Sequence, residues 1–198
     1  MFVDYLTLLL LNMSAGLVIL ALFLGSWIDR DPKKAIPGFL LVGAVALVGG
    51  FGIVLTWPLP GPFNIAFGEM TVLLGGLFFV TGLALSFGWN LASVGVYAVF
   101  AGAAAVLLAF RILSLGLTSE PVPAALGYAG AGVTAILMLP SLTLPKLKWL
   151  RALTMIIALL TALCWALVAF PSYWVHMEQF AKWPGIIGAV HAAPAPAQ

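Results

Sequence analysis

Side chains that could carry out chemistry are few in this sequence and lie far apart. The chain has two histidines, His176 and His191, and one cysteine, Cys164. The stretch His176-Met177-Glu178 offers too few donors for a zinc site, and His191 lies in a tail of low complexity, which argues against a haem held by two histidines. No serine and histidine fall together within an apolar stretch. We therefore expect neither enzymatic activity nor a metal or other cofactor.

Arg111 is the one ionisable residue that lies clearly inside an apolar stretch. A charged group in hydrocarbon is costly, so such a residue is a functional hypothesis by default. Its guanidinium can reach lipid headgroups along its aliphatic stem, or it can pair with Glu69, which begins another apolar stretch. A carboxylate at the beginning of a helix is also stabilised by the helix dipole without any partner.

Polar residues and glycines in or beside the apolar stretches are our candidates for the mouth of a solute pathway. An asparagine such as Asn12 can hydrogen-bond to another helix or contact a polar solute. Small residues either let helices pack closely or line a narrow pore. The candidate set consists of Asn12, Asn64, Glu69, Arg111, Gly75 and Gly76.

The composition places these residues in a membrane. Hydrophobic residues make up 64% of the 198 residues and charged residues 7%, and the mean hydropathy is +1.18. Soluble domains are nearer half apolar and a quarter charged. The net charge of +2 is too small to indicate an anionic partner. The composition thus excludes a soluble enzyme, a disordered chain, a disulfide scaffold and a nucleic-acid binder.

Six apolar stretches are long enough to cross a lipid bilayer, which takes about 20 helical residues. They are too long and too little alternating for the strands of a barrel. We therefore predict an all-α polytopic membrane protein, a six-transmembrane-helix bundle that forms one domain over residues 1–170. The predicted spans are Tyr5–Ile28, Ile36–Trp57, Met70–Phe87, Leu91–Leu117, Val122–Leu144 and Trp149–Phe170.

Basic residues predict the orientation of the bundle. The gap after the first span carries Arg30, Lys33 and Lys34, and the gap before the sixth span carries Lys146 and Lys148. The second and fourth gaps contain no lysine or arginine. Positive charge collects on the cytoplasmic side, and the first, third and fifth gaps of a six-span protein share one side. We therefore expect a multi-pass protein of the inner, cytoplasmic membrane with both termini outside.

The second gap, Pro58–Glu69, has an unusual composition. Its three prolines and the glycine among them exclude a helix, and its aromatic residues are too apolar for a freely solvated loop. The gap is either a loop in the membrane interface or a re-entrant segment that covers the outer mouth. Non-helical backbone at membrane depth is tolerated only where it lines a cavity or is buried in protein.

The sequence changes in character after residue 170. Tyr173, Trp174 and Trp183 are interspersed with charged residues, a mixture typical of a segment that lies in the membrane interface. Ala192–Gln198 is of low complexity, so we expect it to be extended or disordered. Residues 171–198 are therefore predicted to form an interfacial and flexible C-terminal tail.

Two stretches of the sequence resemble the amide/urea channel family. The first is the Asp-Pro-Lys turn at Asp31–Lys33, and the second runs through the glycine- and aromatic-rich Leu73–Phe79 to the tight turn at Phe87–Asn90. The resemblance implies a six-span channel with outer termini. The aromatic pore residues of that family are replaced here, for example at Val94–Val96, and the sixth span lacks the carboxylate that the family carries.

The proline-rich gap resembles a second family more closely. The pattern is Pro-Leu-Pro-Gly, then Phe-Asn-Ile, then Phe-Gly-Glu, all within residues 58–69. An uncharacterised family of bacterial and archaeal multi-pass membrane proteins is similar to the chain in the same gap. This resemblance implies family membership and brings no known activity.

Two functions are compatible with these observations. The first is a channel or facilitator for a small neutral polar solute, such as urea or an amide, which is passive because no Asp, Glu or His inside a span can couple transport to an ion. The second is a non-catalytic accessory subunit of a larger membrane complex of the respiratory type. A channel should assemble as a closed ring of identical subunits in the lipid bilayer, whereas a subunit should purify with other membrane chains.

Cysteine labelling tests the predicted orientation. A membrane-impermeant thiol reagent added outside should react with a cysteine placed at Ser172 and not with one placed at Lys34, because the two positions are predicted to lie on opposite sides. The reverse labelling pattern would show that the termini face the cytoplasm.

Overall fold

The computed structural model describes residues 5–118 and 120–182. In this part of the chain, six helices are long and apolar enough to cross a membrane, so the predicted all-α bundle of a multi-pass membrane protein is confirmed. The helices are α1 (Tyr5–Leu22), α2 (Ile28–Arg30), α3 (Ile36–Thr56), α4 (Met70–Phe87), α5 (Ala92–Leu115), α6 (Pro121–Thr143) and α7 (Lys148–Ala181).

Short turns of other helix types extend three of these helices. A π-helical turn, Phe23–Trp27, joins α1 to α2, and a 3-10 turn, Pro32–Ala35, leads into α3. A second π-helical turn, Asn64–Glu69, leads into α4. The first membrane span therefore covers Leu6–Arg30 and the third covers Asn64–Phe87, so both are longer than the sequence predicted.

The expectation that the whole proline-rich gap is non-helical is wrong for its second half. Pro58, Pro60 and Pro62 all precede the helical residues, and the Ala66 N–H donates to the Pro62 carbonyl at 2.9 Å. A proline disrupts a helix by lacking its own N–H donor, and its carbonyl can still accept the first helical hydrogen bond.

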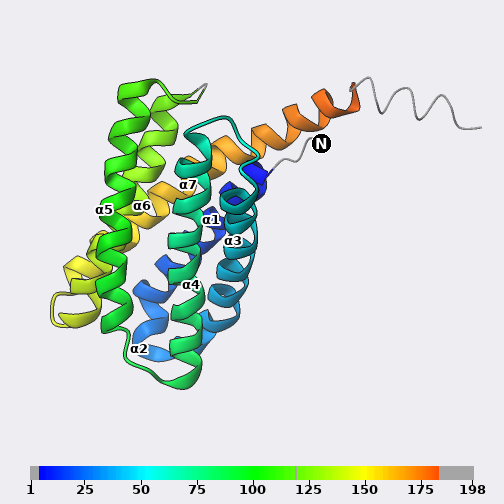
Figure 1. The fold of residues 1–198 in the computed structure, drawn as a ribbon. Helices are drawn as coiled ribbons and strands as arrows, with labels where there is room; N and C mark the ends of the chain where they lie inside the picture. The colour runs from blue at the N-terminus through cyan, green and yellow to red at the C-terminus, as the bar shows by residue number, and fades with distance from the viewer. Residues whose placement is uncertain (1–4, 119, 183–198) are drawn as a thin grey trace, which may run out of the picture.

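The six long helices close into a ring. α1 packs against α3 and α7, α4 packs against α3 and α5, and α6 packs against α5 and α7. Figure 1 shows α5 and α6 side by side, with α7 crossing obliquely behind them toward α1. The loop over residues 57–63, the first residue of α1 and the last residue of α7 lie at one end, which we call the proline end. The opposite end, with α2 and the loop over residues 144–147, is the basic end.

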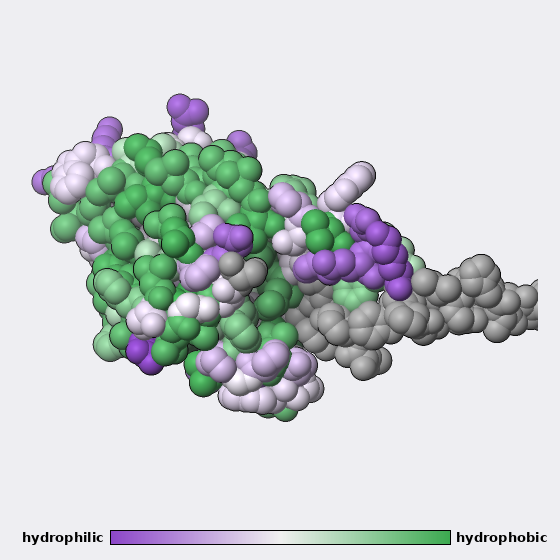
Figure 2. Space-filling view, turned by 90° about the horizontal axis from the view of Figure 1, so that it is seen from above, coloured by the Kyte–Doolittle hydropathy of each residue, from purple (hydrophilic) through white to green (hydrophobic). Residues whose placement is uncertain are grey.

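The outside of the ring is apolar, as a surface in contact with lipid must be. On α3, Leu41, Val48 and Leu55 are 66%, 78% and 79% exposed. These residues are seven positions apart and so share one face of the helix. Figure 2, a view onto the proline end, shows hydrophobic residues over most of the body. Hydrophilic residues lie at points on its rim and in a cluster on the right-hand side of the view.

Helix α7 continues past Phe170, the predicted end of the sixth span, and runs through Pro171 to Ala181. The last turns of α7 project beyond the ring at the proline end (Figure 1). The predicted tail is therefore helical over residues 171–181, while residues 183–198 lie outside the described part of the chain.

Glycines allow the closest contacts between neighbouring helices. A Cβ atom added at Gly43 of α3 would overlap the backbone nitrogen of Phe79 on α4. A Cβ atom added at Gly102 of α5 would lie 2.5 Å from the carbonyl oxygen of Gly132 on α6. No real side chain is accommodated at such distances, so these two helix pairs require glycine at the contact.

Alanine substitutions in α3 test the glycine contacts. Gly43→Ala should lower the free energy of unfolding by about 1–3 kcal/mol, because the new methyl group overlaps the α4 backbone. Gly52→Ala is the matched control on the same helix, since a Cβ atom there meets nothing within 4 Å. It should leave stability unchanged or raise it by up to about 1 kcal/mol. Equal destabilisation by the two variants, measured by unfolding in detergent, would contradict the α3–α4 packing.

Candidate solute pathway

Two cavities lie in series within the ring of helices. The larger cavity is at the proline end and has a volume of about 290 Å³, and the smaller one lies toward the basic end with a volume of about 70 Å³. Met13 of α1 and Leu74 of α4 line both cavities. These two side chains, 5% and 7% exposed, therefore lie where the cavities adjoin, a place that we call the Met13–Leu74 constriction.

Three aromatic side chains line the proline-end cavity. The ring centroids of Phe67 and Tyr128 are 6.2 Å apart, and those of Tyr128 and Trp165 are 5.8 Å apart in an edge-to-face arrangement. The Tyr128 hydroxyl donates to the Ala66 carbonyl at 2.9 Å. The indole of Trp165 packs on Gly127, where an added Cβ atom would overlap Nε1. These contacts hold the rings of α6 and α7 in fixed positions beside the cavity.

Polar side chains line the same cavity. The Thr7 hydroxyl and Nδ1 of His176 are hydrogen-bonded at 3.2 Å, which joins α1 to the extended part of α7. Ser172 also lines the cavity, and its hydroxyl donates to the Val168 carbonyl at 2.8 Å. Glu120 is the only carboxylate among the described lining residues. The extension of α7 beyond Phe170 thus supplies two of the polar groups of this cavity.

The basic-end cavity is almost entirely apolar. Phe39 and Phe78 lie on its lining with ring centroids 5.7 Å apart. Its polar side chains among the described residues are Thr81, whose hydroxyl donates to the Leu77 carbonyl at 2.6 Å, and Thr134, whose buried hydroxyl has no hydrogen-bond partner there. An ion would lose its hydration in this cavity without gaining a charged partner, so the cavity opposes the passage of ions.

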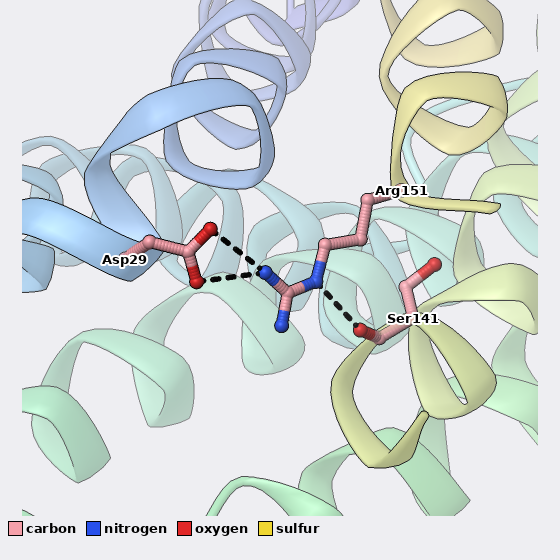
Figure 3. Close-up of polar contacts among 3 residues, drawn as sticks. All are labelled: Asp29, Ser141 and Arg151. Atoms are coloured by element: carbon pink, nitrogen blue, oxygen red, sulfur yellow. Dashed lines mark hydrogen bonds and ion pairs between the residues drawn. The ribbon is translucent and has the colours of Figure 1, made fainter. Parts of the chain in front are cut away.

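An ion pair holds the helices together at the basic end (Figure 3). Nη1 of Arg151 lies 2.8 Å from Oδ1 and 3.1 Å from Oδ2 of Asp29, and Nε donates to the Ser141 carbonyl at 3.1 Å. The Arg151 side chain is only 11% exposed. The Ser141 hydroxyl is also hydrogen-bonded to that of Thr154 at 3.0 Å. One arginine on α7 therefore fastens the end of the first span and the end of α6.

Asn12 and Asn64, both predicted for the solute mouth, hydrogen-bond to backbone groups. Nδ2 of Asn12 donates to the Val42 carbonyl at 2.9 Å and so joins α1 to α3. Asn64 is fully buried and accepts from the Leu59 N–H at 2.9 Å, while its amide donates to the carbonyls of Leu59 and Gly61. Asn64 thereby organises the proline-rich loop, and neither asparagine lines the two cavities.

The pairing of Arg111 with Glu69 that the sequence suggested is not present. Both side chains are exposed, and Nη1 of Arg111 donates to the Ser114 hydroxyl at 3.4 Å on its own helix. Within residues 5–118 and 120–182, no ion pair joins them. The structure thus leaves the guanidinium on the surface of α5, consistent with the alternative that it reaches the lipid headgroups.

Gly75 and Gly76 do not line the cavities either. A Cβ atom at Gly75 would lie 2.5 Å from Cβ of Ala46, so Gly75 is a contact between α4 and α3. A Cβ atom at Gly76 would meet nothing closer than Leu47, at 4.0 Å. The face of α4 that lines the cavities runs from Met70 through Leu74 to Phe78.

Sequence reasoning missed four residues that the structure places on the pathway: Met13, Leu74, Tyr128 and Trp165. Tyrosine and tryptophan in membrane proteins concentrate at the two interfaces. Tyr128 and Trp165 lie away from the ends of α6 and α7, and this position was a usable signal for an internal role. Met13 and Leu74 gave no such signal, because any membrane span offers similar residues.

Comparisons with known proteins agree with the resemblances found in the sequence. The family described as "Protein of unknown function (DUF981)" matches residues 1–179. Among solved structures, the chain is similar to the cryo-EM structure of the Helicobacter pylori urea channel in its closed state, with a TM-score of 0.67 and 20% identity over 86% of this chain and 98% of that chain. No curated protein sequence matches significantly. The predicted uncharacterised family and the predicted fold resemblance are both confirmed.

Double-mutant cycles test the two charge arrangements. Asp29→Asn and Arg151→Gln should show a coupling free energy of about 0.5–1 kcal/mol, because the Asp29 carboxylate is partly exposed. Glu69→Gln and Arg111→Gln should be additive within about 0.3–0.5 kcal/mol, because the side chains do not meet. Unfolding in detergent measures both cycles. Coupling in the second cycle together with additivity in the first would contradict the geometry described above.

Proposed function

The chain belongs to the DUF981 family of proteins of unknown function, and we propose that it is a passive channel for small neutral polar solutes such as urea or an amide. The observation that carries the proposal is the pair of cavities on either side of the Met13–Leu74 constriction. Together they extend from the proline end toward the basic end inside a closed ring of helices. A solute would enter the larger, partly polar cavity and pass a short apolar barrier into the smaller cavity.

The distribution of ionisable groups supports transport of uncharged solutes. Among the described lining residues, the ionisable side chains are Glu120, Tyr128 and His176, and all three line the proline-end cavity alone. No titratable group at the constriction is available there to bind a coupling proton, and the apolar lining offers no ligand to a sodium ion. Moving an ion through such a region is expensive. The width of the pathway and the absence of charged side chains from it would therefore select small uncharged solutes.

The similar fold also supports the proposal. The Helicobacter pylori urea channel has a similar arrangement of helices. At 20% identity, this similarity establishes the fold, and the choice of solute rests on the cavities. In the basic-end cavity, the hydroxyls of Thr81 and Thr134 are the polar side-chain groups of the described lining that a small neutral solute would meet.

The proposed orientation has both termini outside, in a multi-pass protein of the inner membrane. The basic residues Arg30, Lys33, Lys34, Lys146 and Lys148 support it, because all of them lie at the basic end. We further propose that identical subunits assemble side by side in the bilayer, which is the common closed arrangement of membrane channels.

Permeability measurements test the proposal. Vesicles that contain the purified protein should equilibrate urea or acetamide faster than empty vesicles, and proton or sodium gradients should not change the rate. Leu74→Trp should reduce the rate to that of empty vesicles, because the larger side chain fills the constriction. Val80→Trp is the matched control on α4, since Val80 is 44% exposed on the outside of the bundle. This variant should keep the parent rate.

The alternative function gives a different result. A protein that adds no permeability for small neutral solutes, and that purifies from its native membrane with other chains, would support an accessory subunit of a larger complex. Unfolding in detergent is the control for both tryptophan variants. If both unfold cooperatively like the parent protein, a lower permeability reflects a blocked pathway and not a misfolded protein.

A further inference from the structure

We infer that the proline-end cavity is a binding site for a small organic cation, specifically an alkylated ammonium group. The site combines one carboxylate, three aromatic rings and a buried hydroxyl without a partner, all on the lining of a cavity of about 290 Å³. This binding site does not depend on the channel function, because binding is measured without transport.

The charge of the lining favours a cation. Glu120 is exposed and lines the cavity, and no lysine or arginine is among the described lining residues. Lys182, which directly follows α7, forms an ion pair with Glu178 at 2.6 Å. His176 lines the cavity as well and shares a hydrogen bond with Thr7. The carboxylate of Glu120 is thus the one acidic side chain among the described lining residues, without a lysine or arginine to oppose it.

The aromatic lining suits an ammonium group that carries carbon substituents. Tyr128 contacts both Phe67 and Trp165, and the interplanar angles of 39° and 75° point the three rings in different directions. A ring attracts an alkylammonium group through its electronegative face, and its apolar surface also packs against the carbon substituents. Met13 and Met70, also on the lining, add polarisable sulfur. A bare inorganic cation would instead need several oxygen ligands.

Thr118 supplies a further indication of a ligand. Its hydroxyl is buried and has no hydrogen-bond partner in the described part of the chain, although it lies on the lining two residues before Glu120. Its backbone φ of 75° is rare for a β-branched residue and is a form of strain that occurs at binding sites. A polar group of a ligand, such as the hydroxyl of choline, would satisfy this buried oxygen.

The cavity holds a small cation but offers it no path onward. A volume near 290 Å³ lies at the lower end of the range for small-molecule sites. Beyond it, the Met13–Leu74 constriction and the apolar basic-end cavity exclude charge. If the proposed function holds, a bound cation should also slow the passage of neutral solutes.

Choline and its uncharged isostere 3,3-dimethylbutan-1-ol are the probes that test the inference. Purified protein in detergent at about pH 8, where histidine side chains are ordinarily neutral, should bind choline in calorimetry and unfold at a higher temperature with it. The isostere has the same shape without the charge, so it should bind at least about two- to fivefold more weakly. Equal binding of the two probes, or no binding of choline at millimolar concentration, would overturn the inference.

Two carboxylate variants locate the site. Glu120→Gln should weaken choline binding about two- to fivefold, the size expected for a partly exposed charge pair, and leave the isostere unaffected. Glu69→Gln is the matched control, because Glu69 is exposed and does not line the cavity. Phe67→Leu should also weaken choline binding about two- to fivefold while keeping an apolar side chain in place. If Glu69→Gln lowers the affinity for choline as much as Glu120→Gln does, the site is not the one assigned here.

Discussion

Close contact of helix backbones at glycine is the constraint on which the rest of this bundle depends. Gly43 lies against the backbone of Phe79, and Gly102 lies against the carbonyl of Gly132, so α3 packs tightly on α4 and α5 packs tightly on α6. In a membrane, apolar surface alone gives helices no reason to associate, because lipid is equally apolar. Tight contact at small residues supplies that reason. The larger side chains then turn either to the lipid or to the axis, where their imperfect fit leaves the two cavities.

The polar interactions act on the ends of the bundle and leave its middle without charge. Arg151 joins α7 to the first span and to α6 at the basic end. At the other end, Asn64 holds the proline-rich loop in shape and Tyr128 joins that segment to α6. Between the two ends, Met13 and Leu74 line both cavities, and the described lining of the basic-end cavity has no ionisable side chain. With this separation, an alkylammonium group bound at the mouth, as we propose, would leave the inner part of the pathway free of charged side chains.

Much of the fold was predictable because the thickness of the hydrocarbon core sets a minimum length for each membrane-spanning helix. Apolar stretches of sufficient length located all six spans, and the turns outside them differed by a few residues where π-helical turns lengthened the first and third spans. The site was much less predictable. The sequence suggested Gly75, whereas the cavity is lined by its neighbour Leu74. It also suggested that Arg111 meets Glu69, whereas Arg111 turns to Ser114. Both differences come from the rotation of a helix about its own axis, which a nearly uniform apolar sequence does not determine.

The central claim is that the Met13 and Leu74 side chains form the barrier between the two cavities. The most direct measurement is the urea permeability of vesicles that contain the Met13→Ala, Leu74→Ala double variant, compared with the parent protein at equal protein content. Removing the two side chains joins the cavities, so the account predicts faster equilibration of urea and no conductance for sodium or chloride. An unchanged or lower urea permeability in a variant that still unfolds cooperatively would show that the barrier lies elsewhere.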